Sequence, residues 1–259
     1  FNPNVYNKIL GVYKSCLQLR ELITELLDFR KQEQGHMTIK VCEHNMVHFI
    51  YEHYLLFLEY AAQRQITFNF EKSSNNISVW FDAKQMQKAI NNLISNAFKY
   101  TKAGGTISIA VRKRNQEVLI EITDNGSGIA EKDIDKIFNR FYQGDGSHTM
   151  HSLGFGIGLN LCQLLVKLHH GIIFAENRTD TQGCRFVIHL PLGCKHLKKE
   201  EMVKVETGLV PHGVMADQYI PYHPSREKVK YRKTNYSVLV IDDDDELRSF
   251  LKDNLAAYY

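Results

Sequence analysis

The sequence predicts an α+β domain, a two-layer sandwich in which one sheet packs against a layer of helices. Two observations lead to this fold class. Some segments repeat apolar residues every three or four positions and others alternate them with polar residues, which are the periods of helices and strands. These segments follow one another without a regular β-α-β order, which favours an α+β arrangement over a parallel sheet. The chain of 259 residues is long enough for one or two ordinary domains.

The composition, with 44% apolar and 24% charged residues, is that of a protein that buries a core. Its net charge of +3 is too close to neutral to predict binding to nucleic acid or to an anionic membrane. No apolar run approaches the roughly 20 residues that a membrane-spanning helix needs, and residues 1–10 lack the pattern of a signal peptide. The five cysteines are Cys16, Cys42, Cys162, Cys184 and Cys194. Their spacing is not that of metal ligands. We expect them to be buried or half-buried thiols in a reducing compartment.

A long amphipathic helix is predicted at residues 4–33. Its apolar residues recur at alternating spacings of four and three, which is typical of a helix that packs lengthwise against a partner helix. Gly35 supplies a C-terminal stop. Because no second helix of this length follows, we expect the partner to be a segment outside this sequence or another copy of the chain.

The region that follows mixes strand and helix patterns, separated by polar turns. We expect its strands to form the sheet and its helices to cover one face. The predicted elements are a strand at 37–42, a helix at 44–64, a hairpin of strands at 66–70 and 77–81, a helix at 83–100, strands at 106–113 and 117–124, helices near 131–138 and at 156–169, and strands at 171–176 and 184–190.

The C-terminal part has a different character. Residues 193–235 carry three of the five prolines and no sustained period, which predicts an interdomain linker. An apolar strand at 236–241 then runs into four aspartates and a short helical pattern. One strand and one helix cannot bury a core alone, so we interpret this part as the beginning of another domain.

Two motifs in the predicted domain carry polar side chains beside a helix or strand. Asn92, Asn96 and Lys99 fall on one face of a helix, because offsets of four and three stack; a solvated helix surface is the alternative. Asp124 follows a strand directly, and Gly126 and Gly128 come after it. Glycines let the backbone approach a flat base while the carboxylate accepts a hydrogen bond from an amine; a glycine-rich turn is the alternative.

A third motif, Gly154, Gly156 and Gly158, precedes a predicted helix. Glycines before a helix N-terminus leave N–H groups and a favourable dipole for phosphate; a flexible hinge is the alternative. The sequence FNRF at 138–141 precedes this motif, and GCRF at 183–186 opens the last strand. This order of motifs is difficult to obtain by chance, so we interpret them together as a nucleotide site.

In this order the motifs resemble those of the catalytic and ATP-binding domain of histidine kinases. The similar segments are 92–100 (N box), 124–128 (first G box), 138–141 (F box), 154–158 (second G box) and 183–186 (third G box). Upstream, residues 17–35 resemble the second helix of a dimerisation and histidine-phosphotransfer domain. Downstream, residues 238–251 resemble the first strand, acidic turn and first helix of a receiver domain.

The resemblance implies a sandwich of the histidine-kinase, chaperone and gyrase ATPase type, preceded by one long bundle helix and followed by the start of a receiver. The implied parts are 1–35 (second helix of the dimerisation domain), 36–192 (catalytic ATP-binding domain), 193–235 (linker) and 236–259 (N-terminal piece of the receiver). The implied cofactors are ATP and Mg²⁺. Residues 143–153 would form a lid over the nucleotide, and Phe155 stands where a smaller residue is common.

The resemblance also implies roles for individual residues. Asn96 would give an oxygen to Mg²⁺, and Asp124 would accept a hydrogen bond from the adenine amine. Asn92, Lys99 and Arg140 would approach the phosphates, and Tyr100 would cover the adenine or ribose. The implied ATP-binding residues are Asn92, Asn96, Lys99, Tyr100, Asp124, Gly126, Gly128, Arg140, Gly154, Gly156, Gly158 and Leu159.

Asp242 and Asp243 resemble the Mg²⁺-binding acidic pair of a receiver. A solvated helix N-terminus, where the dipole favours acidic side chains, is the alternative. The family's phosphate acceptor is a histidine on the first helix of the dimerisation domain, but residues 1–35 contain none. His36 and the pair His169–His170 are interpreted as surface or capping residues, so we expect the acceptor helix to precede Phe1.

The implied function is that of the ATP-binding region of a hybrid sensor histidine kinase, which passes phosphate from ATP to histidine and on to a receiver aspartate. The parent protein is expected to be a homodimer, with this region in the cytoplasm of a bacterium as part of an inner-membrane-anchored sensor. Two alternatives stay open. They are a nucleotide-binding signalling scaffold without kinase activity, and another ATPase of the same fold.

Overall fold

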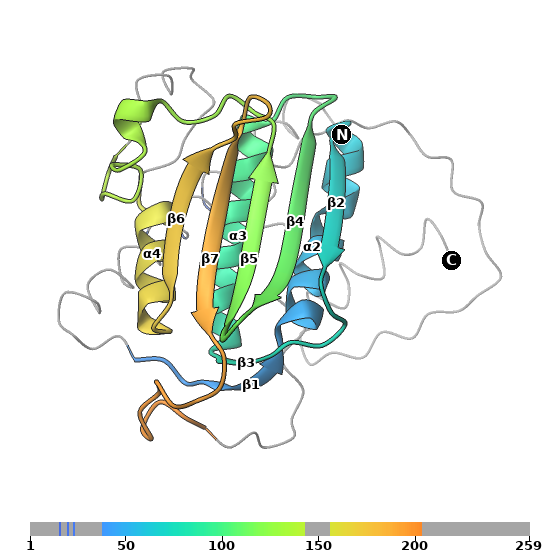
Figure 1. The fold of residues 1–259 in the computed structure, drawn as a ribbon. Coiled ribbons are helices and arrows are strands. Elements are labelled where there is room, and N and C mark those ends of the chain that lie inside the picture. The colour runs from blue at the N-terminus through green and yellow to red at the C-terminus, as the bar shows by residue number, and fades with distance from the viewer. Residues whose placement is uncertain (1–15, 17–19, 21–22, 24–37, 143–155, 204–259) are drawn as a thin grey trace, which may run out of the picture. The chain divides into compact units, whose positions relative to one another are not determined.

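The computed structural model of this chain describes residues 38–142 and 156–203, together with Cys16, Arg20 and Ile23. The centre of the domain is a five-stranded sheet in the order β2-β4-β5-β7-β6 (Figure 1). Neighbouring strands are antiparallel except β2 and β4, which are parallel. The strands are β2 (Thr67–Lys72), β4 (Thr106–Arg114), β5 (Glu117–Asp124), β6 (Ile172–Asn177) and β7 (Cys184–Pro191).

Helices cover one face of this sheet, as Figure 1 shows. They are α2 (Met46–Gln63), α3 (Ala83–Tyr100) and α4 (Gly158–Leu168). Side-chain oxygens of Asn45 and Asp82 cap the first two helices by accepting hydrogen bonds from backbone N–H groups. The predicted α+β sandwich is thus confirmed, as are its helices at 44–64, 83–100 and 156–169 to within a few residues.

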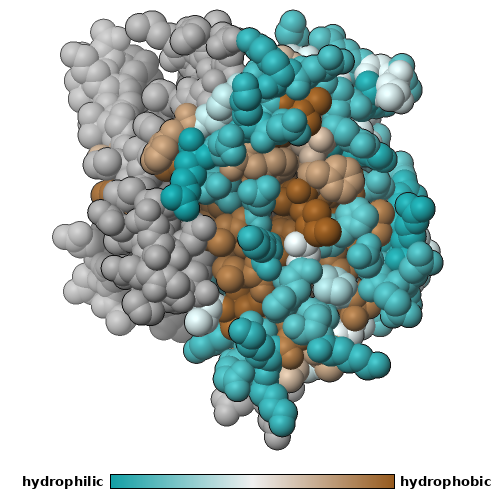
Figure 2. Space-filling model, turned by 60° about the vertical axis from the view of Figure 1, so that its left-hand side comes forward, coloured by the Kyte–Doolittle hydropathy of each residue, from teal (hydrophilic) through white to brown (hydrophobic). Residues whose placement is uncertain are grey.

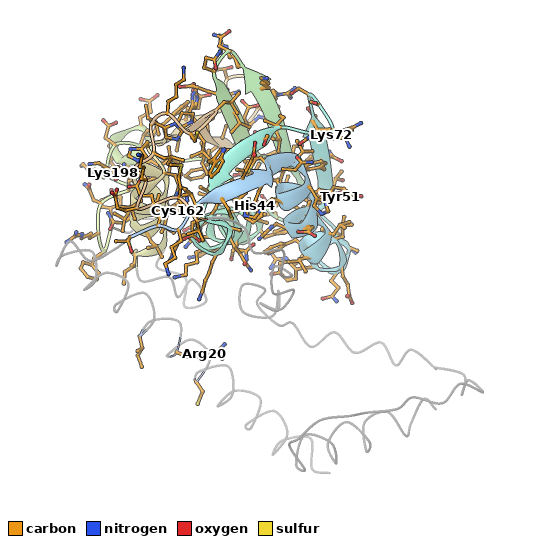
Figure 3. All side chains as sticks on the ribbon, turned by 90° about the horizontal axis from the view of Figure 1, so that it is seen from below. Arg20, His44, Tyr51, Lys72, Cys162 and Lys198 are labelled. Carbon is orange, nitrogen blue, oxygen red and sulfur yellow. The ribbon has the colours of Figure 1, made fainter. Side chains whose placement is uncertain are left out.

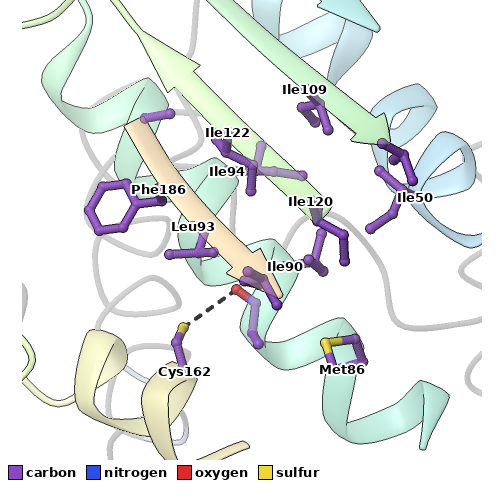
Figure 4. Packing of buried hydrophobic residues seen from close by; sticks show 14 of the residues in the cluster. Ile50, Met86, Ile90, Leu93, Ile94, Ile109, Ile120, Ile122, Cys162 and Phe186 are labelled. Atoms are coloured by element: carbon purple, nitrogen blue, oxygen red, sulfur yellow. Dashed lines mark hydrogen bonds between the residues drawn. The ribbon is translucent and has the colours of Figure 1, made fainter. Parts of the chain in front are cut away.

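The core lies between the sheet and the helices. One face of α3 supplies apolar side chains, and the inward positions of β4 and β5 meet them (Figure 4). Each such side chain stabilises the fold by about 1.5–3 kcal/mol when it leaves water. Those drawn at this contact include Ile90, Leu93, Ile94, Ile109, Ile120 and Ile122, none more than 1% exposed.

Three local predictions are wrong. Strands β2 and β3 (Ser78–Phe81) exist, but they form no hairpin, because β2 pairs with β4 and β3 pairs with β1 (Cys42–Asn45). Alternation of apolar residues indicates a strand but does not specify its partner. The strand predicted at 37–42 begins only at Cys42. The helix predicted near 131–138 is a 3-10 helix at Glu131–Asp133 followed by turns.

Residues 193–203, the exit segment, return to the beginning of the domain. Val41 and Met202 form a parallel bridge, in which the N–H of Val41 donates to the carbonyl of Glu201 at 2.7 Å. Leu197 packs with Ile39 and Val41 in a second, smaller core. The exit segment, predicted as the start of a linker, is therefore packed through Val203, while residues 204–235 lie outside the described ones. In Figure 3, Lys198 of this segment and Tyr51 of α2 lie on opposite sides of the domain.

The face of the sheet opposite the helices carries a row of charged residues that crosses all five strands. Arg112 contacts Glu71 at 2.7 Å and Glu121 at 3.1 Å. Arg185 contacts Glu121 at 3.1 Å and also pairs with Glu176. Because the arginine of each pair is more than 40% exposed, each pair contributes little to stability, and the row mainly keeps this face polar.

Exposed apolar side chains also occur on the edge strand β6. Ile172 is 66% exposed and Phe174 is 38% exposed. On the side of α4 and β6, hydrophilic groups interrupt the apolar surface (Figure 2). No helix within residues 38–142 and 156–203 combines the length and apolar character that crossing a bilayer requires.

The expectation for the cysteines is only partly confirmed. Cys162 and Cys184 are buried and Cys42 is half-buried, but Cys16 and Cys194 are exposed. Cys16, Arg20 and Ile23 are helical, and the rest of the helix predicted at 4–33 lies outside the described residues.

His169 caps the end of α4, as one interpretation predicted, but it is not a surface residue, since it is 2% exposed. Its Nδ1–H donates to the carbonyl of Leu165 at 2.7 Å, and its Nε2 accepts from the N–H of Asp82 at 2.9 Å. The ring therefore ties the end of α4 to Asp82, the residue that caps the start of α3.

Candidate functional site

A buried carboxylate stands at the end of β5. Asp124 is 2% exposed. Its Oδ1 accepts from the N–H of Gly126 at 2.8 Å, and its Oδ2 accepts from the thiol of Cys184 at 3.0 Å. A carboxylate held this way keeps unused lone pairs, so it can accept a further hydrogen bond from a ligand.

Glycines allow the backbone to close around Asp124. A β-carbon on Gly126 would lie 2.4 Å from the carbonyl oxygen of Tyr100, and one on Gly183 would lie 2.1 Å from that of Asp124. Gly183 also has a φ of +129°, which other residues rarely adopt. These contacts bring the end of α3 and the start of β7 against the end of β5, so a side chain at either glycine would push these elements apart.

Two asparagines lie on the polar face of α3. The Nδ2 of Asn96 donates to Oδ1 of Asn92 at 3.0 Å, as the offset of four residues predicts. This bond uses the nitrogen of Asn96 and leaves its oxygen for another partner. An amide oxygen is a ligand that Mg²⁺ accepts.

The N-terminus of α4 packs directly on this asparagine pair. A β-carbon on Gly158 would lie 2.1 Å from Nδ2 of Asn92, so only glycine fits there without displacing the amide. Among the described residues, no side chain caps the first turn of α4. Uncapped N–H groups and the helix dipole therefore face the same region as Asn92, which suits an anionic group.

The last turn of α3 borders the region between these groups. Nζ of Lys99 lies 5.2 Å from the centre of the Tyr100 ring, a cation–π contact, and Tyr100 is 47% exposed. Leu159 is half-buried at the start of α4. The roles of Lys99, Tyr100 and Leu159 toward a nucleotide stay predictions.

The segment at 138–142 is attached to α4 and to β7. The Nδ2 of Asn160 donates to the carbonyl of Phe138 at 2.8 Å, and the Phe138 ring meets that of Phe186 edge-on. Arg140 is exposed and has contacts of its own. Gly154, Phe155, the predicted lid at 143–153 and the acidic pair Asp242–Asp243 all lie outside the described residues.

Sequence reasoning missed two residues that hold the site together. Asn177 binds Ile129 twice, accepting from its N–H at 2.8 Å and donating to its carbonyl at 2.6 Å, and so fixes the turn after Asp124. Cys184 contacts the carboxylate of Asp124 itself. The GCRF motif at 183–186 includes Cys184, but a motif does not show which of its side chains faces the site.

The end of β5 and the last turn of α3 lie at the upper end of the domain in Figure 1, and the beginning of α4 packs against α3 at Asn92. They place a fixed carboxylate at one side, and an amide pair with the N-terminus of α4 at the other. Such a site suits a ligand with a hydrogen-bond donor at one end and anionic groups with a cation at the other.

Comparisons with known proteins identify the family of this domain. Residues 81–193 match the family described as "Histidine kinase-, DNA gyrase B-, and HSP90-like ATPase". Histidine kinase P4 of Formosa agariphila is 32% identical over 262 residues, which cover 98% of this chain and 19% of that protein. Sensor histidine kinase RppB of Synechocystis is 30% identical over 194 residues, which cover 74% of this chain and 42% of that protein.

Solved structures share the fold. The catalytic domain of histidine kinase ThkA superimposes with a TM-score of 0.53 at 28% identity, covering 60% of this chain and 97% of that one. Full-length ShkA in complex with AMPPNP superimposes with a TM-score of 0.64 over 73% of this chain and 39% of that one. At 20% identity, the second likeness concerns the fold alone.

The fold and the family match together define an ATPase domain of the two-layer α+β type. More narrowly, this chain carries the ATP-binding catalytic domain of a histidine kinase, a class of enzyme that works in two-component signalling. The chain spans only 19% and 42% of the length of the two curated relatives named above.

Proposed function

We propose that this chain is the kinase core of a hybrid sensor histidine kinase. Its catalytic domain binds ATP with Mg²⁺ and transfers the γ-phosphoryl group to a histidine that this sequence does not contain. A receiver aspartate then takes the phosphoryl group. The observation that carries the proposal is that α3 contacts both parts of the site: its end packs against the turn after Asp124, and its Asn92–Asn96 pair packs against the start of α4.

The adenine end of the site is assigned to Asp124. Its carboxylate is buried, held by two donors, and approached by backbone at Gly126 and Gly183. An exocyclic amine is the donor that such an acceptor selects, because a buried carboxylate facing another acceptor would be costly. Tyr100, half exposed beside it, would cover the base or the ribose.

The phosphate end is assigned to α3 and α4. The first N–H groups of α4 and the side chains of Asn92 and Lys99 would bind phosphate oxygens. The oxygen of Asn96, which its bond to Asn92 leaves available, fits Mg²⁺. When bound, Mg²⁺ supplies charge that neutralises the phosphates. The residues themselves position the nucleotide, and positioning is most of what phosphoryl transfer asks of a protein.

Further parts of the proposal concern the parent protein. The helix predicted at 4–33 would contribute to a homodimer, and Asp242 and Asp243 would open a receiver that accepts the phosphoryl group. The histidine kinase ThkA has been solved in complex with the response regulator protein TrrA, and in that structure ThkA is 24% identical to this chain. Attachment of the parent protein to an inner membrane, with this region in the cytoplasm, belongs to the same proposal.

Radiolabelled ATP tests the transfer. This chain and a longer version that continues upstream would each be incubated with Mg²⁺ and γ-labelled ATP. We expect acid-labile label on a histidine of the longer version and none on this chain. Stable phosphohistidine on this chain, or a longer version that binds ATP but never becomes labelled, would overturn the proposed transfer; the second result favours a nucleotide-binding scaffold.

A further inference from the structure

The contact between Cys184 and Asp124 joins two strand ends that are 60 residues apart in the sequence. Cys184 is the first residue of β7 and is 7% exposed. Its Sγ lies 3.0 Å from Oδ2 of Asp124, within the hydrogen-bond range for sulfur. Gly183, just before it, allows the backbone of β7 to touch the backbone of Asp124. The thiol therefore faces the carboxylate because of the main-chain geometry on both sides.

The thiol of Cys184 acts as the donor in this contact. Burial raises its pKa, and the negative charge of Asp124 raises it further. A protonated thiol can donate, whereas a thiolate beside a carboxylate would repel it. The same raised pKa makes Cys184 a poor nucleophile, so its role lies in hydrogen bonding and not in covalent chemistry.

The two oxygens of Asp124 are held from different elements. The turn after β5 supplies the N–H of Gly126 to Oδ1, and β7 supplies the thiol of Cys184 to Oδ2. Rotation of the carboxylate would break both bonds. Its remaining lone pairs are therefore fixed in direction before any ligand arrives, and such preorganisation makes a hydrogen bond to a ligand more selective.

We propose that Cys184 is a positioning residue that sets the preference of the site for a base with an amine donor. The inference rests on the proposed nucleotide function and deepens it. Adenine offers an amine to the carboxylate, whereas hypoxanthine offers a carbonyl oxygen at the corresponding place. A carboxylate that Cys184 holds in place rejects the carbonyl, since two acceptors would face each other in a buried site. A carboxylate that is free to turn would distinguish less well between adenine and hypoxanthine.

The experiment compares ADP with IDP. The affinities of both nucleotides are measured by calorimetry for the wild-type chain, Cys184→Ser and Cys184→Ala. Serine keeps a hydrogen-bond donor at this place and alanine removes it. We expect Cys184→Ser to keep the ADP-to-IDP preference within about twofold, and Cys184→Ala to lower it by about tenfold, the value of one hydrogen bond to a charged group.

Cys162→Ala is the matched control. Cys162 is also buried, but its thiol contacts the carbonyl of Ala89 in the core at 3.5 Å. We expect this variant to lose stability without changing the base preference. Equal loss of preference in Cys184→Ser and Cys184→Ala would show that Cys184 merely fills space and would overturn the inference. So would an unchanged preference in Cys184→Ala.

A spectroscopic measurement covers the case in which Cys184→Ala does not fold. The infrared S–H band of Cys184 is assigned by subtracting the spectrum of Cys184→Ser from that of the wild type. We expect a hydrogen-bonded band that shifts when Asp124 is changed to Asn; a band that does not respond would refute the contact. A wild-type chain that binds neither ADP nor IDP would instead overturn the proposed function together with this inference.

Discussion

Gly158, the first residue of α4, lies so close to Asn92 on α3 that a β-carbon there would come within 2.1 Å of the amide nitrogen. This contact joins the two halves of the predicted phosphate region, the polar face of one helix and the N-terminus of another. It explains in steric terms why a glycine is needed at position 158, the third glycine of the motif at 154–158.

Gly158→Ala should therefore weaken nucleotide binding more than it weakens the fold. Asn92 can turn its amide away from the added methyl group, but it then gives up its bond to Asn96. We expect the ADP affinity to fall by at least about tenfold, with only a small change in the thermal midpoint. Calorimetry and thermal unfolding measure the two effects.

Gly104→Ala is the control for Gly158→Ala. Gly104 has a φ of +80° and nothing within 4 Å of an added β-carbon, so its substitution strains the backbone without touching the site. We expect it to cost stability, about 1 kcal/mol, with nucleotide affinity unchanged. If both variants lost affinity equally, the contact with Asn92 would have no special role.

Asn96→Ala tests the assignment of the Mg²⁺ ligand. The wild-type chain should bind ADP more tightly with Mg²⁺ than with a chelator, because the oxygen of Asn96 contributes to the bound ion. In the variant this dependence on Mg²⁺ should largely disappear. Asn69→Ala, an exposed change on β2, should keep it. If the Asn96→Ala variant gained as much ADP affinity from Mg²⁺ as the wild type, the ion would have to be bound by other residues.

Acid should destabilise the domain through His169. Burial lowers the pKa of His169, and His170 lowers it further, while Leu165, Asp82 and Glu201 act in the opposite direction. Between the ordinary histidine pKa of about 6.5 and this lowered value, the unfolded chain binds more protons than the folded one. The free energy of unfolding should therefore fall as the pH falls through this window. His53, whose pKa burial also lowers, should add to the effect.

Denaturant unfolding from about pH 7.5 to about pH 5 measures this dependence. His169→Gln keeps an acceptor for the N–H of Asp82 but does not titrate, so its stability should vary less with pH. His48→Gln changes a side chain that is 69% exposed and should leave the wild-type dependence intact. An identical pH dependence in wild type and His169→Gln would exclude His169 as a source.

The exit segment should contribute measurably to stability. Leu197 is 9% exposed and packs on Ile39 and Val41, so Leu197→Ala should cost about 2 kcal/mol. Hydrogen exchange at Val41 should speed up, because its N–H donates to the carbonyl of Glu201. Ile172→Ala, at a side chain that is 66% exposed, should change the stability little. A Leu197→Ala variant as stable as the wild type would mean that the exit segment is not part of the folded domain.

The sequence was informative where one local pattern decided the structure. The apolar face of α3 and the alternation in β4 and β5 predicted these three elements nearly to the residue. The period of the buried apolar residues is enough to distinguish a helix from a strand and to set its ends. The asparagine pair followed from the spacing of four within one helix. Asp124 and its glycines were found for a similar reason, since all lie within five residues of one turn.

Long-range pairing could not be predicted in the same way. The alternation in β2 is satisfied equally by β3 or β4, and only the assembled sheet selects β4. The exit segment has too few apolar residues to show a period, yet Leu197 and Met202 find partners at Ile39 and Val41. Cys184 contacts Asp124 across 60 residues, so nothing in the local sequence of either one points to the other.

A calorimetric titration with Mg²⁺ and ATP tests the central claim most directly, in the wild-type chain, Asp124→Ala and the exposed control Asp180→Ala. The account predicts one nucleotide per chain for wild type and Asp180→Ala, and an affinity at least about tenfold weaker for Asp124→Ala. Equal affinities in all three proteins, or no binding by a folded wild-type chain, would contradict it.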